Sequence, residues 1–404
     1  MRGVQGGGDD MAMTRRSMIT AAILAAGTAL TGAASWAQDA APFKIGLILP
    51  MTGPFASTGR QIETAARLYI SEHGDTVAGR KIELIVQDDA GTADTTKRIA
   101  QEMIVTDKVS VLAGFGLTPL ALAVAPLAAR GKTPAVVMAA ATSSVTEASP
   151  YMVRTSYTTP QVTSKIAEWA ASDGIKSVVT VVSDYGPGID AEKTFVEGFT
   201  AAGGEILDTL RMPLQNPDAS PFLQKVADRK PDAIFVFLPS GAAAPFMKQF
   251  VERGLDTSGI RLIGDGGLTD DDILNGMGTA AVGAITGFHY SAAHDSAANK
   301  AFVEGYGTLG KGGRPNFMAA GGYDGMHLIY AALEKAGADA DGEALIEAMK
   351  GQSWESPRGP VTIDPETRDI VQNVYMRRVE EKDGALWNIE FKTYEAVKDP
   401  AHGK

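Results

Sequence analysis

The sequence predicts an α/β protein that is built from two units, each with a doubly wound parallel β-sheet. Apolar runs of strand length alternate with helical patterns over most of the chain, which is typical of parallel sheets. This alternation starts at Phe43 and starts again at Gln161. The 404 residues, 45% apolar and 21% charged, suffice for two or three compact units with a large core.

The stretch from Phe43 to Ile70 predicts the first strand, loop and helix. Phe43 to Leu49 is apolar except for Lys44 and a glycine, which indicates a strand buried on both faces. Pro50 and a Gly/Pro-rich segment end the strand, and from Arg60 the apolar residues return at helical spacing. In open α/β sheets ligands bind at such a corner, and the helix N-terminus there favours an anion.

The alternation of strand and helix patterns continues to about residue 155. It predicts strands at 81–88, 109–113 and 135–138 and helices at 92–106 and 118–130. Thr118 is predicted to cap the second of these helices, with Pro119 at its first position. The uncharged run from Val109 to Ala129 is long enough to span a bilayer, but its glycines and prolines favour a strand, a loop and a buried helix.

The second set of units predicts strands at 177–183, 206–212, 233–238 and 262–264 and helices at 192–202, 222–229 and 245–253. From about His289 the pattern becomes helical, at 297–306, 318–336 and 343–349. A strand at 359–363 follows. A hairpin of 374–380 and 386–391 turns at Lys382-Asp383-Gly384.

Two motifs make the chain resemble a known family. Pro50, Thr52 and Gly53 match a P-x-[ST]-G loop after the first strand, and Asp88-Asp89 match a D-D pair after the second. The chain resembles the leucine/isoleucine/valine-binding family, the type I periplasmic solute receptors of ABC transporters, over nearly all of 43–404. The resemblance implies two lobes, 43–156 plus 288–366 and 157–287 plus 367–398, joined by a three-strand hinge. It also implies hinge closure on a ligand and an ABC permease of the inner membrane as partner.

The N-terminus predicts export. Arg15 and Arg16 precede an uncharged run and then Ser35-Trp36-Ala37, so we expect residues 1–37 to be a signal peptide cleaved after Ala37 and the mature protein to be periplasmic. The twin arginines leave the twin-arginine route and ordinary secretion both open. We expect the mature protein to be a monomer.

Composition and motif content narrow the possible functions. A net charge of −11 without a basic run argues against nucleic-acid binding. The lack of cysteine excludes thiolate catalysis and Cys-ligated metals. The chain has neither H-E-x-x-H, nor G-x-S-x-G, nor a dinucleotide fingerprint. We therefore predict no catalytic residue, no metal and no cofactor.

The resemblance implies that the ligand's carboxylate is held by two loops of the first lobe, matched here by Phe115–Thr118 and Ala139–Thr142. A buried carboxylate needs several donors, which hydroxyls and backbone N–H groups at helix starts supply. Helix capping alone is the alternative role for these threonines. Second-lobe contacts are expected after three strand ends. The predicted ligand-binding residues are Thr58, Phe115, Leu117, Thr118, Ala140, Ala141, Thr142, Tyr185, Ser240, Asp265 and Gly266.

One departure from the family pattern bears on the ligand. Amino-acid receptors of the family carry a Glu for the α-ammonium where this chain has Gly266, with Asp265 one residue away. We therefore expect a small carboxylate without an ammonium, such as an aromatic or 2-keto acid. Asp184 and Asp265 could still pair with an ammonium, so branched-chain amino acids are the alternative, and a sensor for a signalling partner would share the pattern. Candidate aromatic walls are Phe55, Phe115, Tyr157, Tyr185, Tyr290 and Tyr323.

Overall fold

The computed structural model describes residues 41–403. The predicted signal peptide lies outside this range. The described residues form two β-sheets. The first part of the chain forms one of them, in which all neighbouring strands are parallel except β2 and β3. Its strands, in spatial order, are β2 (Thr76–Val77), β3 (Arg80–Asp88), β1 (Phe43–Leu49), β4 (Val111–Gly114), β5 (Ala135–Val137) and β6 (Met152–Arg154).

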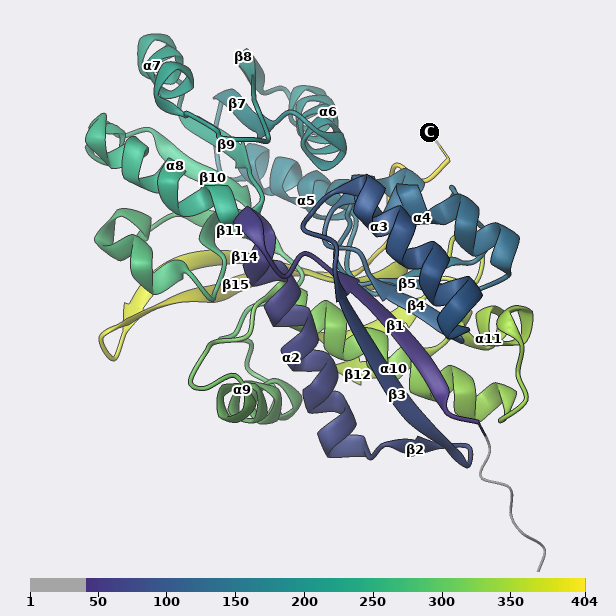
Figure 1. Ribbon diagram of the computed structural model, residues 1–404. Coiled ribbons are helices and arrows are strands. Elements are labelled where there is room, and N and C mark those ends of the chain that lie inside the picture. The colour runs from purple at the N-terminus through teal and green to yellow at the C-terminus, as the bar shows by residue number, and fades with distance from the viewer. Residues whose placement is uncertain (1–40, 404) are drawn as a thin grey trace, which may run out of the picture. The chain divides into compact units, whose positions relative to one another are not determined.

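Helices cover both faces of this sheet because alternate strand residues point to opposite sides. Leu47 packs into a core with one group of helices, and its neighbour Ile48 packs into a core with another group (Figure 1). The first group is α2 (Ala56–His73), α10 (Phe317–Ala336) and α11 (Gly342–Met349). The second group is α3 (Ala93–Glu102) and α4 (Thr118–Gly131).

The other sheet has nine strands. Its middle is parallel, whereas β11 to β14 and the β14–β15 hairpin are antiparallel (Figure 1). In spatial order the strands are β12 (Ser353–Ser356), β13 (Gly359–Ile363), β14 (Ile370–Lys382), β11 (Ile285–Phe288), β10 (Arg261–Asp265), β9 (Ala233–Phe237), β7 (Ser177–Ser183) and β8 (Glu205–Met212), with β15 (Ala385–Val397) on β14.

This sheet is also covered on both faces. Val178 and Val182 of β7 pack with α5 (Thr159–Ser172) and α6 (Gly186–Ala201). Val179 and Val181 pack with α7 (Ser220–Arg229) and α8 (Ser240–Glu252). The remaining helix, α9 (Ala297–Leu309), lies against α2. The prediction of an α/β fold with parallel sheets in two lobes is confirmed, whereas the exact lobe boundaries stay predictions.

Buried arginines hold the segments that connect the two sheets. Arg154 lies 2.7 Å from Asp369, and both side chains are almost fully buried. Arg358 pairs with Asp324 at 2.6 Å and donates to the carbonyl of Ser156. A buried arginine is stable only when its donors are satisfied, and these donors bind backbone carbonyls between β6 and α5. The ion pairs therefore set the path of the chain between the sheets.

Several element predictions were wrong at their edges. The N-cap of α4 is Leu117 and not Thr118, whose hydroxyl bonds elsewhere. The helix expected from Pro245 begins at Ser240, because three alanines before the proline favour helix. Strands β11 and β12 were not predicted, because they are short and contain a glycine or polar residues. Val109 to Ala129 form a strand and a helix, and no helix within residues 41–403 is long and apolar enough to cross a membrane.

Candidate functional site

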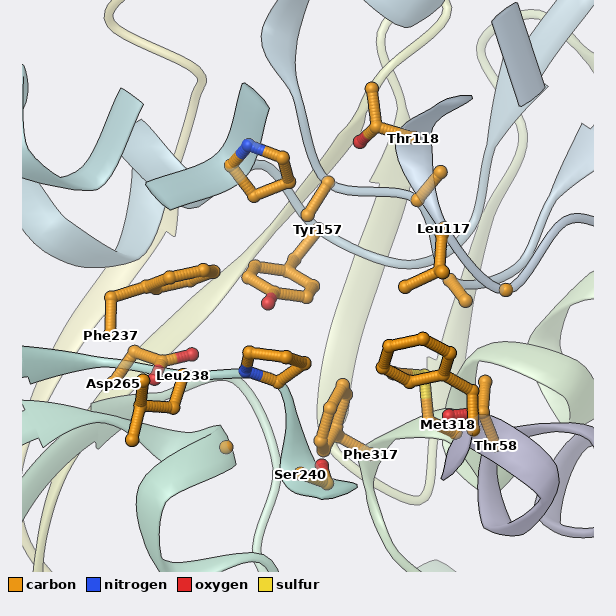
Figure 2. A pocket seen from close by; sticks show the side chains of 18 of the residues that line it. Thr58, Leu117, Thr118, Tyr157, Phe237, Leu238, Ser240, Asp265, Phe317 and Met318 are labelled. Carbon is orange, nitrogen blue, oxygen red and sulfur yellow. The ribbon is translucent and has the colours of Figure 1, made fainter. Parts of the chain in front are cut away.

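A cavity with an empty volume of about 460 Å³ lies between the strand-end loops of the two sheets (Figure 2). One side includes residues that follow β1, β4 and β5, and the other includes residues at or just after the ends of β7, β9 and β10. Ligand sites in open α/β sheets lie at these carboxyl ends. The lining residues are Phe55, Thr58, Gly116, Leu117, Thr118, Ala139, Ala140, Ala141, Tyr157, Tyr185, Pro187, Phe237, Leu238, Pro239, Ser240, Asp265, Gly267, Phe317 and Met318.

The first-sheet side of the cavity carries hydrogen-bond donors. Thr118 begins α4, where the first N–H groups have no partner inside the helix. Its hydroxyl donates to the Thr142 hydroxyl at 3.1 Å and accepts from the Thr142 N–H at 3.4 Å. Within residues 41–403 the N–H of Ala141 has no hydrogen-bond partner, whereas that of Ala140 donates to the Phe115 carbonyl. The backbone N–H groups of Thr118 and Ala141 are therefore available as donors to an anion, aided by the positive end of the α4 dipole.

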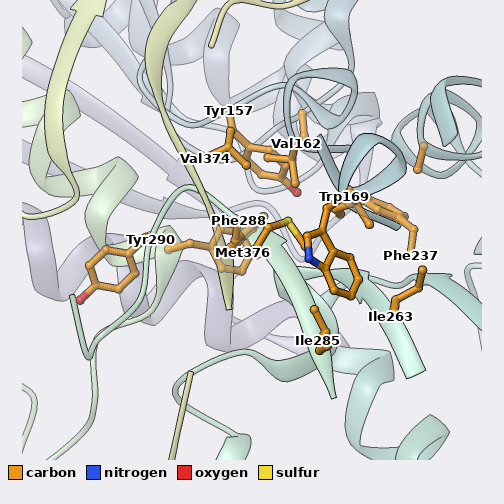
Figure 3. Close-up of a cluster of buried hydrophobic side chains, with 14 of the residues drawn as sticks. Tyr157, Val162, Trp169, Phe237, Ile263, Ile285, Phe288, Tyr290, Val374 and Met376 are labelled. Carbon is orange, nitrogen blue, oxygen red and sulfur yellow. The ribbon is translucent and has the colours of Figure 1, made fainter. Parts of the chain in front are cut away.

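Aromatic rings form the middle of the cavity. Phe55 comes from the short helix before α2, Phe237 from the end of β9 and Phe317 from the start of α10. Tyr157 also lines the cavity, with its ring centroid 5.0 Å from that of Phe288 and 4.8 Å from that of His289. Figure 3 shows Tyr157 and Phe237 within the hydrophobic cluster that includes Phe288. These walls suit a flat apolar group.

Asp265 lies at the end of β10 on the second-sheet side and is 2% exposed. Burial raises the pKa of its carboxyl to about 7, although the Gly267 N–H and Arg377 favour the charged form. Burial, with Asp265 nearby, also raises the pKa values of Tyr157 and Tyr185 well above the usual range. Asp265 is therefore a carboxyl group whose charge is easily lost near neutral pH.

The two sides of the cavity touch at two glycines. A Cβ atom on Gly186, at the start of α6, would lie 2.6 Å from the Thr142 hydroxyl oxygen. A Cβ on Gly241, near the start of α8, would lie 2.6 Å from the Pro54 carbonyl oxygen. Both contacts are between a residue of one lobe and a residue of the other. At these two positions the lobes approach each other too closely for a side chain larger than the hydrogen of glycine, unless the neighbouring atoms shift.

The cavity brings together most of the predicted ligand-binding residues. Eight line it: Thr58, Leu117, Thr118, Ala140, Ala141, Tyr185, Ser240 and Asp265. Thr142 lies behind Thr118, and Phe115 is fully buried in the core of the first sheet. Gly266 does not line the cavity, and its carbonyl accepts a hydrogen bond from Arg377. The role of these residues in binding stays a prediction.

The candidate walls divide in the same way. Phe55, Tyr157 and Tyr185 line the cavity, whereas Phe115, Tyr290 and Tyr323 do not. Tyr290 is buried in the core, and the Tyr323 hydroxyl donates to Glu72 at 2.7 Å.

Sequence reasoning missed two aromatic residues, Phe237 and Phe317. Phe237 stands at the end of a strand, before the loop on which the prediction concentrated, and that position was a signal that it could reach the cavity. Phe317 follows Asn316, which caps α10 through hydrogen bonds to two N–H groups. Nothing in the sequence near Phe317 indicated that this helix start reaches a cavity formed by residues far away in the chain.

The chain belongs to the periplasmic binding protein family, whose model matches residues 42–385. It is 45% identical over 362 residues to the Leu/Ile/Val-binding protein homolog 6 of Brucella abortus (strain 2308), a match that covers 88% of this chain and 93% of that protein. The family predicted from the motifs is confirmed.

Two solved structures are similar over nearly their whole length. A solute-binding protein of an ABC transporter from Rhodopseudomonas palustris BisB5, in complex with 3,4-dihydroxybenzoic acid, is 62% identical with a TM-score of 0.88, covering 89% of this chain and 99% of that one. The R. palustris protein RPA0985, in complex with 4-hydroxybenzoate, is 41% identical with a TM-score of 0.85, covering 89% and 98%. The family and these neighbours assign this chain a role in solute binding for transport.

Proposed function

We propose that this protein is the exported solute receptor of an ABC importer and that it captures an aromatic carboxylate of the benzoate type. The observation that carries the proposal is the composition of the cavity, in which donors at Thr118 and Ala141 adjoin walls of aromatic rings. The binding of 3,4-dihydroxybenzoic acid and 4-hydroxybenzoate by two similar proteins supports it.

In this proposal the carboxylate lies against Thr118 and Ala141, and the ring lies among Phe55, Phe237 and Phe317. Contacts from both lobes give the ligand a higher affinity for the closed form, which drives closure by hinge motion. The closed form is then recognised by the ABC permease. The protein binds and releases its ligand without chemistry.

A branched-chain amino acid is the second candidate. The Brucella relative is named as a homolog of Leu/Ile/Val-binding proteins, and Asp265 supplies a carboxyl group that could pair with an α-ammonium. A sensory role is the alternative of another class, and a histidine kinase gene beside this one, in place of permease genes, would favour it.

Isothermal titration calorimetry on residues 38–404 tests the ligand class. The panel is benzoate, 4-hydroxybenzoate, 3,4-dihydroxybenzoate, benzoylformate, leucine and valine. We expect one or more aromatic acids to bind tightly and to raise the melting temperature by mass action. Tight binding of leucine or valine without binding of any aromatic acid would show that the proposed ligand class is wrong.

A further inference from the structure

The cavity has a second polar end that the carboxylate of the ligand does not use. Of the described residues that line the cavity, only Asp265 is acidic. Figure 2 shows Asp265 and Thr118 on opposite sides of the cavity, with the Tyr157 ring between them. Asp265 comes from β10 of the second sheet, whereas Thr118 begins α4 beside the first sheet. A molecule held at Thr118 would therefore extend toward Asp265.

Asp265 differs from most of the other buried aspartates in what it contacts. Asp89 accepts hydrogen bonds on both carboxyl oxygens, from the Gly91 N–H and the Thr96 hydroxyl. Asp324 and Asp369 likewise have both oxygens paired. The Oδ1 atom of Asp265 is buried and has no hydrogen-bond partner within residues 41–403. Asp270 also has a buried Oδ1 atom without a hydrogen-bond partner within residues 41–403, but Asp270 does not line the cavity. A buried carboxyl without partners destabilises the fold, so its presence at a cavity wall indicates a role in binding.

We propose that Asp265 recognises a hydroxyl group on the ligand's ring, opposite the carboxylate, so that the cavity selects para-hydroxylated benzoates over benzoate and over α-amino acids. The inference rests on the proposed function, because it takes the carboxylate to lie at Thr118. A para-hydroxybenzoate holds its two polar groups at opposite ends of a rigid ring, as the cavity does. The hydroxyl is both donor and acceptor, so it can pair with the carboxyl group in either protonation state.

An α-ammonium fits this arrangement less well. In an amino acid the ammonium and the carboxylate are bound to the same carbon, whereas Asp265 and Thr118 lie across the cavity from each other. An ammonium also has three N–H donors that all need acceptors when buried. Besides Asp265, the polar side chains of this end are Tyr157, Tyr185 and Ser240, whose hydroxyls can also act as donors.

The experiment compares dissociation constants for 4-hydroxybenzoate and benzoate by calorimetry at pH 8. The proteins are residues 38–404 of the wild type, of Asp265→Leu, and of Asp184→Asn as a matched control. Asp184 is an exposed aspartate that directly follows β7 of the same sheet and does not line the cavity. We expect the wild type and the control to bind 4-hydroxybenzoate roughly 10- to 100-fold more tightly than benzoate, which is the effect of one hydrogen bond to a charged group.

In Asp265→Leu this ratio should fall to about one, because leucine has a similar volume and no polar atom. Using a ratio within each protein separates recognition of the hydroxyl from a general loss of folded protein. Equal binding of both ligands by the wild type, an unchanged ratio in Asp265→Leu, or the same loss in Asp184→Asn would overturn the inference. If the wild type binds neither benzoate nor 4-hydroxybenzoate, the proposed function itself fails.

Discussion

Thr118 and Thr142 are the side chains on which the donor end of the cavity depends. Of these two residues, Thr118 lines the cavity, whereas Thr142 only contacts Thr118, through the hydrogen bond of 3.1 Å between their hydroxyls. In the ligand-free protein the Thr118 hydroxyl donates to Thr142, and we expect it to turn to the ligand's carboxylate on binding. Thr118→Val should then weaken aromatic-acid binding roughly 10- to 100-fold, because it removes one hydrogen bond to a charged group. Thr142→Val should weaken it less. Calorimetry on the two variants measures the difference, and equal losses would contradict a direct role for Thr118 alone.

Asp265 should make the stability of the ligand-free protein depend on pH. The pKa of this carboxyl is about 7 in the folded protein and 3.8 ordinarily, so the folded state holds its proton more firmly. Stability should therefore fall as pH rises from about 4 to about 7. Burial also raises the pKa values of the neighbouring carboxyls of Asp270 and Asp271, so their titration contributes to the wild-type profile and only the comparison with an Asp265 variant isolates Asp265. The other neighbours do not titrate in this window. Tyr157 and Tyr185 stay neutral, burial lowers the pKa of His289 well below its usual range, and Arg377 stays charged.

Asp265→Asn tests this dependence, since asparagine does not titrate. At pH 8 the variant should be more stable than the wild type by up to about 4 kcal/mol, from a difference of three pKa units at about 1.4 kcal/mol each. The advantage should shrink as the pH falls toward 4. Urea unfolding at several pH values measures it, and a difference that does not vary with pH would show that Asp265 does not titrate in this way.

At the scale of elements, the starts of α6 and α8 decide how closely the lobes approach. Gly241→Ala places a methyl group against the Pro54 carbonyl and should obstruct closure, so affinity should fall at least about tenfold. The separate lobe should not be destabilised, because alanine favours helix over glycine by about 1 kcal/mol. In Gly241→Ala the affinity, measured by calorimetry, should therefore fall, while the melting temperature of the ligand-free protein, measured by thermal unfolding, should rise.

Gly307→Ala is the matched control. This glycine also lies in a helix, α9, and the nearest atom to its added Cβ would be 3.9 Å away. Its replacement should leave affinity unchanged. If Gly241→Ala binds as tightly as Gly307→Ala, the contact with Pro54 does not limit closure.

At the scale of the whole molecule, buried ion pairs connect segments that are far apart in the chain. Asp369→Asn leaves the Arg154 guanidinium buried without its counter-charge, although Arg154 also donates to the carbonyls of Ala140 and Thr142. Breaking such a pair should cost about 3–5 kcal/mol of unfolding free energy. As a control, Arg211→Met removes the partly exposed pair with Glu192 and should cost less than about 1 kcal/mol. Urea unfolding compares the two.

Much of the fold could be predicted from the sequence because local patterns specify it. The apolar run of Phe43–Leu49 is a strand with the predicted bounds, and the turn at Asp383-Gly384 closes the predicted hairpin. Element edges were less predictable: Thr118 is the first residue of α4 and not its cap, and α8 begins at Ser240 and not at Pro245. Eight predicted site residues line the cavity because each lies at or after the end of a parallel strand, a position visible in the sequence.

The sequence by itself determined the α/β class, the family and the loops that surround the cavity, since hydrophobic periodicity and short motifs are local properties. Only the tertiary structure decided which side chains face inward. Asp265 lines the cavity and Gly266 does not, because neighbouring residues of an extended chain point in opposite directions. Phe317 reaches the same cavity from a helix more than 200 residues after Phe55, because chain packing and not sequence proximity sets that contact.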